Sequence, residues 1–228
     1  MQLSKITRSS RRGFRAFFVV LIGFLLIGGS AVPAHALRER ARDSSDDSKQ
    51  DYERLQRIMI PLIRASNQSR RANEISVRIV NEPSINAGSA GGGEFLVTTG
   101  LLRRANDDQL RGVLAHEVAH ADLGHVAKAQ ALGTGLNIGM ILLDQFIPGS
   151  GKITPVIADL GVMRPFSREE EYEADAHGVD ILRRAGYDGK QVMSSTLPWL
   201  LRTSGSSGGF FATHPGTEDR IQRVNSLP

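Results

Sequence analysis

The sequence His116-Glu117-Val118-Ala119-His120 lies inside a long apolar stretch and decides how the rest of the chain is interpreted. Residues 107–131 carry apolar side chains nearly all round a helical repeat, which predicts a helix buried inside a domain. Two histidines four positions apart project from one face of such a helix, about one turn apart. That spacing suits two ligands of a tetrahedral zinc ion.

Glu117 follows the first histidine, and its side chain points about 100° round the helix from it. From there it can reach a water molecule beside the metal, so we expect Glu117 to act as the general base of a hydrolase. The alternative is a helix whose histidines are satisfied by ordinary hydrogen bonds. The burial of two histidines and a glutamate in an apolar helix argues against that alternative.

The third ligand has to come from another part of the chain. A metzincin would need Gly at 123 and His at 126, but the chain has Leu123 and Val126. The acidic run at 167–175 offers carboxylates instead, on a helix predicted over 167–185. One face of that helix carries Glu171, Ala174, Asp175, Gly178, Ile181, Leu182 and Ala185, whereas Glu169, Glu170 and Glu173 point elsewhere and are expected in solvent.

This helical spacing favours Glu171 as the third ligand, which predicts a gluzincin-type site. Asp175 lies one turn further along the same face. From there it can accept the outer N–H of a ligand histidine and fix the tautomer of that ring. The small residues of this face would let the helix approach the zinc helix closely.

Three segments resemble a known family by their content and order: residues 116–120, residues 167–175 and Thr213-His214-Pro215. Over about residues 52–226 the chain resembles the HtpX-like, Oma-like and CAAX-prenyl-endopeptidase family of zinc metallopeptidases, peptidase family M48. The resemblance implies zinc ligands at His116, His120 and Glu171, one zinc ion per chain, and Glu117 as catalytic residue. It also links the soluble periplasmic members to protein quality control in the cell envelope.

His214 is the remaining catalytic candidate. It follows the Ser/Gly segment 204–209 and precedes Pro215, where its side chain could stabilise the oxyanion of the reaction. The resemblance also allows His214 to bind the metal as a fourth ligand, and an ordinary surface histidine is the third option. For the other histidines we expect a packing or hydrogen-bonding role at His125 and solvent around His177.

The predicted fold class is α+β, mostly helical, with a small β-sheet whose edge strand lines the active-site cleft. Ile75, Val77 and Ile79 alternate with polar residues and predict one strand, whereas 81–93 is turn-rich. A second strand is predicted at 95–99, as the edge strand that binds an extended substrate through its backbone. The substrate-binding residues would be Phe95, Leu96, Val97 and Thr98.

The N-terminus predicts an export signal at 1–36, a flexible charged linker at 37–50 and the metallopeptidase domain at 51–228. A basic stretch ends at Arg15, an apolar run spans 16–27, and Ala34-His35-Ala36 matches a cleavage site. Residues 10–15 also resemble a twin-arginine signal, and a retained membrane anchor is the less favoured alternative. The expected location is the periplasm or cell envelope.

Composition excludes several classes of protein. The chain of 228 residues has no cysteine, which excludes disulfide scaffolds, thiol nucleophiles and iron–sulfur clusters. The 28 basic and 24 acidic residues give a charge of +4. Five of the basic residues and none of the acidic ones lie in 1–36, so the remainder has 23 against 24, about −1. A nucleic-acid partner is therefore not expected.

The predicted function is a zinc metalloendopeptidase that cleaves unfolded or misfolded envelope proteins. A chaperone-like binding module with a latent or inactive zinc site is the main alternative, although Glu117 argues against it. A zinc hydrolase for non-peptide amides of the cell wall is another. Peripheral contact with a membrane or an outer-membrane assembly is a further candidate partnership.

Overall fold

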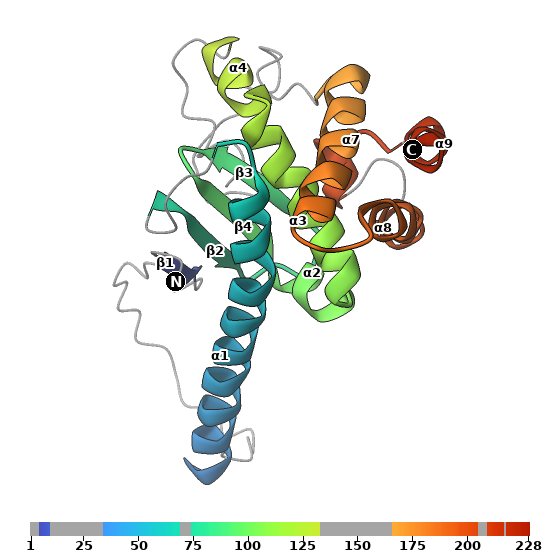
Figure 1. The fold of residues 1–228 in the computed structure, drawn as a ribbon. Helices are drawn as coiled ribbons and strands as arrows, with labels where there is room; N and C mark the ends of the chain where they lie inside the picture. Colours follow the sequence, from blue (N-terminus) through green and yellow to red (C-terminus); the bar gives the residue numbers. More distant parts are fainter. Residues whose placement is uncertain (1–4, 10–33, 69–73, 133–165, 205–208, 217) are drawn as a thin grey trace, which may run out of the picture.

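The computed structural model describes residues 5–9, 34–68, 74–132, 166–204, 209–216 and 218–228. Its strands form one sheet in the order β1-β2-β4-β3, parallel except for β3, which runs antiparallel to β4 (Figure 1). The strands are β1 (Lys5–Ser9), β2 (Ser76–Val80), β3 (Ala87–Gly91) and β4 (Glu94–Thr98). The helices are α1 (Ala34–Ala65), α2 (Thr99–Arg104), α3 (Asp107–Asp122), α4 (His125–Leu132), α7 (Arg168–Arg184), α8 (Gly189–Ser204), the 3-10 helix η2 (Gly209–Ala212) and α9 (Glu218–Ser226). The predicted fold class, mostly helical with a small sheet, is confirmed.

The edge strand beside the site is β3, not the predicted strand at 95–99. β4 lies between β2 and β3, so its backbone is paired on both sides. Its side chains are buried as well, and the prediction that they bind substrate is therefore wrong; these residues are Phe95, Leu96, Val97 and Thr98. β3 was missed because it consists of small residues instead of branched or aromatic ones. Its last residue, Gly91, has a positive φ like Gly92 and Gly93 of the turn that follows, so the segment has the composition of a turn.

Helix α3 passes through the middle of the domain, and most of its side chains are buried, as predicted. Asn106 caps its start by accepting a hydrogen bond from the backbone N–H of Gln109. The helix ends at Asp122, not near 131, because Gly124 has a φ of 75° and interrupts it. The chain then continues as α4, which begins directly at His125.

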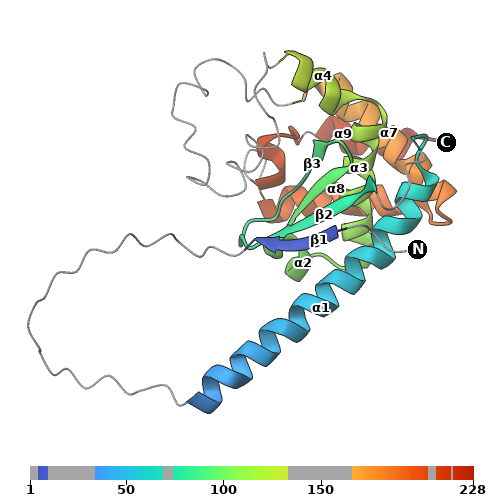
Figure 2. The ribbon, with the colours of Figure 1, turned by 90° about the vertical axis from the view of Figure 1, so that its left-hand side faces the viewer.

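Helix α7 packs against α3, and both helices lie on the same side of the sheet (Figures 1 and 2). Gly178 lies at the contact, where a Cβ atom would come within 3.4 Å of the backbone nitrogen of His116. Helix α7 therefore approaches α3 closely, as its small residues indicated.

The predicted linker at 37–50 is helical, so that part of the prediction is wrong. It belongs to α1, which extends away from the other described elements at its N-terminal end (Figure 2). Residues 34–60 contain neither Gly nor Pro, and the buried residues Leu55, Met59 and Leu62 hold the later turns of the helix on the domain. None of the helices in the described ranges is long and apolar enough to span a membrane, and the apolar run at 16–27 lies outside those ranges.

Candidate metal centre

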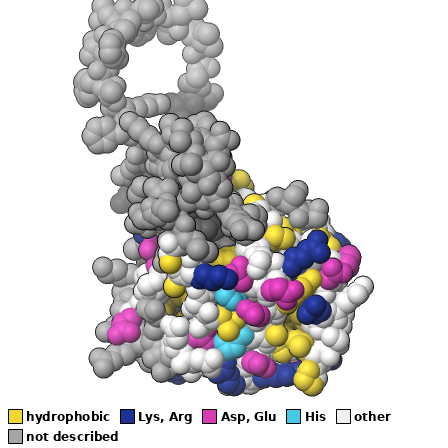
Figure 3. Space-filling model, turned by 90° about the horizontal axis from the view of Figure 1, so that it is seen from above, with side chains coloured by type: hydrophobic (Ala, Val, Ile, Leu, Met, Phe, Trp, Pro, Cys, Tyr) yellow, Lys and Arg dark blue, Asp and Glu magenta, His cyan; other side chains and the backbone are white. Residues whose placement is uncertain are grey.

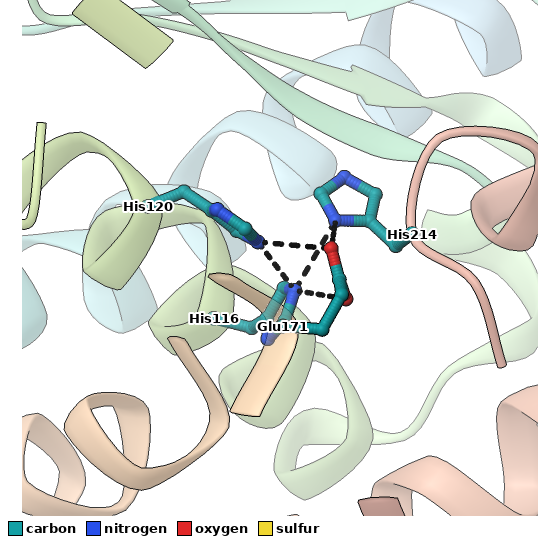
Figure 4. Close-up of side chains that lie close together, drawn as sticks. All are labelled: His116, His120, Glu171 and His214. Carbon is teal, nitrogen blue, oxygen red and sulfur yellow. Dashed lines mark hydrogen bonds and ion pairs between the residues drawn. The ribbon is translucent and has the colours of Figure 1, made fainter. Parts of the chain in front are cut away.

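Four buried side chains from three parts of the chain meet at one point. Helix α3 provides His116 and His120, α7 provides Glu171, and the turn after η2 provides His214 (Figure 4). Each of the four residues offers one ligand atom, and these four atoms all lie within 4.8 Å of one another. Within the ranges that the structure describes, this is the only such group of potential metal ligands.

The spacing of the ligand atoms fits a tetrahedral zinc ion. His116 Nε2 lies 3.0 Å from His120 Nε2 and 3.2 Å from His214 Nδ1. Glu171 Oε2 lies 3.4 Å from His116 Nε2. Glu171 Oε1 lies 3.4 Å from His120 Nε2 and 3.1 Å from His214 Nδ1. Zinc–ligand bonds of about 2.0–2.1 Å give a tetrahedron with edges of ~3.3 Å. Two imidazole nitrogens with a carboxylate are also a donor set typical of catalytic zinc sites.

Glu117 lies between this cluster and the edge strand β3. Its Oε2 accepts a hydrogen bond of 3.0 Å from the backbone N–H of Ser89, and its Oε1 is 3.3 Å from His214 Nε2. The side chain is almost completely buried, and this burial raises the pKa of the Glu117 carboxyl. A carboxylate with a raised pKa next to a metal site suits a group that accepts and returns a proton.

Arg220 of α9 contacts both acidic groups of the site, Asp175 and Glu171, and its role was not predicted from the sequence. Its Nε and Nη2 each donate a hydrogen bond of 2.7 Å to Asp175, and its Nη1 lies 2.6 Å from Glu171 Oε2. Asp175 Oδ1 lies 2.9 Å from His116 Nδ1. The structure thus brings Asp175 to the outer nitrogen of His116, and Arg220 neutralises the carboxylates around it.

The charges within the cluster shift the pKa values of its members. Burial lowers the pKa of His116, but Asp175 and Glu171 outweigh it and raise the pKa to about 9. Burial, followed by the neighbouring His116, lowers the pKa of His120 well below its usual value. Burial favours a higher pKa for Glu171, yet His214 and then Arg220 hold it well below the normal range. The carboxylate is therefore kept in the charged form that a metal requires.

His214 is buried, so the surface option is wrong. Its ring stacks on Phe210 at 4.4 Å between centroids, with 12° between the planes. Nδ1 faces the ligand atoms of His116 and Glu171, whereas Nε2 faces Glu117. Both remaining roles, oxyanion stabiliser and fourth ligand, are compatible with this position.

The expectation for His125 is confirmed, and the expectation for His177 is wrong. His125 is buried and makes hydrogen-bond contacts of 3.0 Å with His120 and with Glu173, whose carboxylate is otherwise exposed. His177 is only 13% exposed at its side chain, because its Nε2 lies 2.7 Å from Asp122. The break at Gly124 after α3 explains the contact between His125 and His120, because this break turns the chain back towards His120.

Comparison with known proteins agrees with this arrangement. A model of peptidase family M48 matches residues 49–227. The chain belongs to this family. The M48 peptidases are zinc-dependent metalloproteases, and the buried donor set of this M48 domain fits that metal.

Three relatives illustrate the range of similarity. Mitochondrial metalloendopeptidase OMA1 of Arabidopsis thaliana is 34% identical over 63% of this chain and 30% of its own length. The beta-barrel assembly-enhancing protease of Escherichia coli is 33% identical over 63% of this chain and 32% of its own length. Metalloprotease LoiP of the same species is 23% identical over 89% of this chain and 86% of its own. The chain spans between 30% and 50% of the first curated relatives that it matches.

Proposed function

We propose that this chain is a zinc metalloendopeptidase that cleaves unfolded or misfolded proteins of the cell envelope. The observation that carries the proposal is the buried group of His116, His120, Glu171 and His214, with the buried Glu117 between it and a sheet edge. In this proposal His116, His120 and Glu171 bind zinc throughout the reaction, and Asp175 orients the ring of His116.

The proposed chemistry is hydrolysis of a peptide bond by water. A bound zinc ion supplies Lewis acidity, which lowers the pKa of water and polarises the substrate carbonyl. Glu117 takes a proton from the attacking water and returns it to the leaving amine. The Nε2 atom of His214 faces Glu117. When the His214 side chain moves out of the ligand cluster, its Nε2–H can donate a hydrogen bond to the oxyanion of the reaction.

The substrate surface that we propose is β3 instead of β4. β3 lies at one edge of the described sheet, the position at which an extended peptide adds as a further strand, and the amide of Ser89 contacts the carboxylate of Glu117. Backbone pairing selects extended chains over particular side chains, which suits unfolded proteins. The name of the beta-barrel assembly-enhancing protease of Escherichia coli associates that relative with β-barrel assembly, and an envelope substrate for this chain is compatible with this association.

The deciding experiment pairs zinc analysis with casein cleavage by wild type and Glu117→Gln. We expect about one zinc per chain in both proteins and a rate at least 100-fold lower in the variant, because positioned acid–base groups contribute about 10²–10⁴-fold. Glu169→Gln, an exposed carboxylate of α7, is the matched control and should cleave like wild type. If both proteins bind zinc and neither cleaves casein, the chaperone-like alternative is favoured, and His214→Ala then tests for latency.

We further propose that residues 1–36 direct export and are removed. Strand β1 falls in this stretch and pairs with β2, at the opposite edge of the sheet from β3, so its removal leaves the site contacts intact. Cell fractionation with N-terminal sequencing should recover the mature protein in the periplasm with Leu37 at its start. A protein that keeps Met1 and sediments with membranes would instead favour the anchor.

A further inference from the structure

The outer nitrogens of the two α3 ligands meet different partners. His116 Nδ1 faces the carboxylate of Asp175 directly. His120 Nδ1 instead lies 3.0 Å from Nδ1 of a second histidine, His125. A metal-bound histidine needs a partner for its outer N–H, because that partner fixes the tautomer and the ring orientation. The partner of His120 is thus the first residue of α4.

The contact continues to α7. His125 Nε2 lies 3.0 Å from Glu173 Oε2, and Glu173 comes two residues after Glu171 on the same helix. His125 is only 5% exposed, whereas the side chain of Glu173 is 63% exposed. The chain of contacts therefore starts at the buried ligand and ends in solvent. Figure 3 views the end of the molecule where α4 and the first turns of α7 lie, and histidine side chains reach the surface there among charged ones.

The proton positions along this chain follow from the metal. His120 has to present the lone pair of Nε2 to the cluster, so its proton is on Nδ1 and is donated to His125 Nδ1. His125 then carries its own proton on Nε2 and donates it to the Glu173 carboxylate. The opposite tautomer of His125 would place two N–H groups against each other. Only when the proton of His125 is on Nε2 does the outer N–H of each ring face an acceptor.

We propose that His125 is a positioning residue for the zinc site: with Glu173 it holds His120 in the tautomer and orientation that bind the metal. The inference rests on the ligand set proposed above. Removal of such outer partners typically weakens metal binding about 10–100-fold. Glu173 should contribute less than His125 because its exposed carboxylate also interacts with water.

The test measures zinc dissociation constants of the full chain by competition with a chelator. His125→Leu fills the space but offers no acceptor, so we expect binding about 10–100-fold weaker. His125→Asn places an amide oxygen near the position of Nδ1 and should recover most of the affinity. Glu173→Gln should weaken zinc binding only a few-fold. His177→Asn is the control, because His177 also pairs with a carboxylate but touches no ligand, and its affinity should equal that of wild type.

Two further measurements separate positioning from folding. Thermal unfolding in excess chelator compares the metal-free proteins, and the visible spectrum of the Co²⁺-substituted protein reports the ligand geometry, which should change in His125→Leu and recover in His125→Asn. Equal zinc affinity in wild type and His125→Leu would overturn the inference, and so would equal losses in His125→Leu and His125→Asn. If His125→Leu does not fold, His125→Ala replaces it, with the same expected loss of zinc affinity relative to His125→Asn. A wild type without zinc would instead overturn the proposed function.

Discussion

The two histidines of α3 that we propose as zinc ligands, His116 and His120, lie one turn apart, yet the regions behind them are built differently. Behind His116, Asp175 and Arg220 form a network that is fully enclosed by the protein. Behind His120, the contacts end at an exposed carboxylate. Buried charges require their partners for folding as well as for function, whereas a chain that ends in solvent can be broken with little loss of stability. Substitutions behind His116 should therefore affect folding and metal binding together, and those behind His120 should affect mainly metal binding.

The largest effect is expected from Arg220→Met. The substitution leaves the buried carboxylates of Glu171 and Asp175 without their cation, so the free energy of unfolding should fall by about 3–5 kcal/mol. Urea denaturation in the presence of chelator measures this loss without a contribution from metal. Arg223→Met on the same helix is the control. Arg223 stacks on the ring of Tyr172 at 3.9 Å at the surface, and its loss should be below about 1 kcal/mol. Similar losses in the two variants would mean that the network behind His116 contributes nothing particular.

Removal of zinc is expected to have a similar effect on the whole domain. The proposed ligands come from α3, α7 and the turn after η2, so a bound metal would join segments that are distant in the sequence. With free zinc a thousandfold above its dissociation constant, binding should add about 4 kcal/mol to the free energy of unfolding. Thermal unfolding should show a lower midpoint after treatment with chelator and recovery with Zn²⁺ but not with Mg²⁺. An unchanged midpoint would contradict the proposed site.

Asp175→Asn tests whether the two regions differ as proposed. It should weaken zinc binding about 10–100-fold, as His125→Leu should. Unlike that variant, it should also lower the unfolding free energy of the metal-free protein by about 1–3 kcal/mol, because Arg220 loses a buried acceptor. Asp180→Asn, an exposed carboxylate of α7, is the control and should change neither quantity. If Asp175→Asn affects only metal binding, the contrast between the two regions is wrong.

The parts of the site that follow local periodicity could be predicted from the sequence. The spacing of His116 and His120, and the stripe that carries Glu171 and Asp175, depend only on helical geometry. Helix α7 indeed begins after Ser167, and its buried face contains the predicted acids and small residues. Whether these residues bind the metal in the proposed roles stays a prediction for the experiments above.

The parts that depend on tertiary contacts could not be predicted in this way. Arg220 lies 45 positions after Asp175, and nothing in its own neighbourhood marks it as buried. A signal did exist, because two carboxylates on a buried face need a compensating cation from some other element. β3 offered no signal, since its alanines and glycines are typical of a turn. The end of α3 was indicated by Gly124, a residue type common just after a helix, but the apolar pattern of 107–131 obscured it.

The smallest expected effect, that of Gly124→Ala, tests how His125 is brought to His120. Gly124 has a positive φ of 75° and open space around its Cα, so the added methyl group causes backbone strain and no clash. We expect a loss of about 1 kcal/mol in stability. Gly186→Ala is a matched control, since Gly186 has a φ of 90°, equally open surroundings and a place just after α7. Both variants should lose similar stability in urea denaturation, but only Gly124→Ala should weaken zinc binding, by less than His125→Leu, because it tilts α4 relative to α3. Equal zinc affinities in the two variants would show that the contact between His125 and His120 tolerates such a tilt, and the turn after α3 would then serve the fold alone.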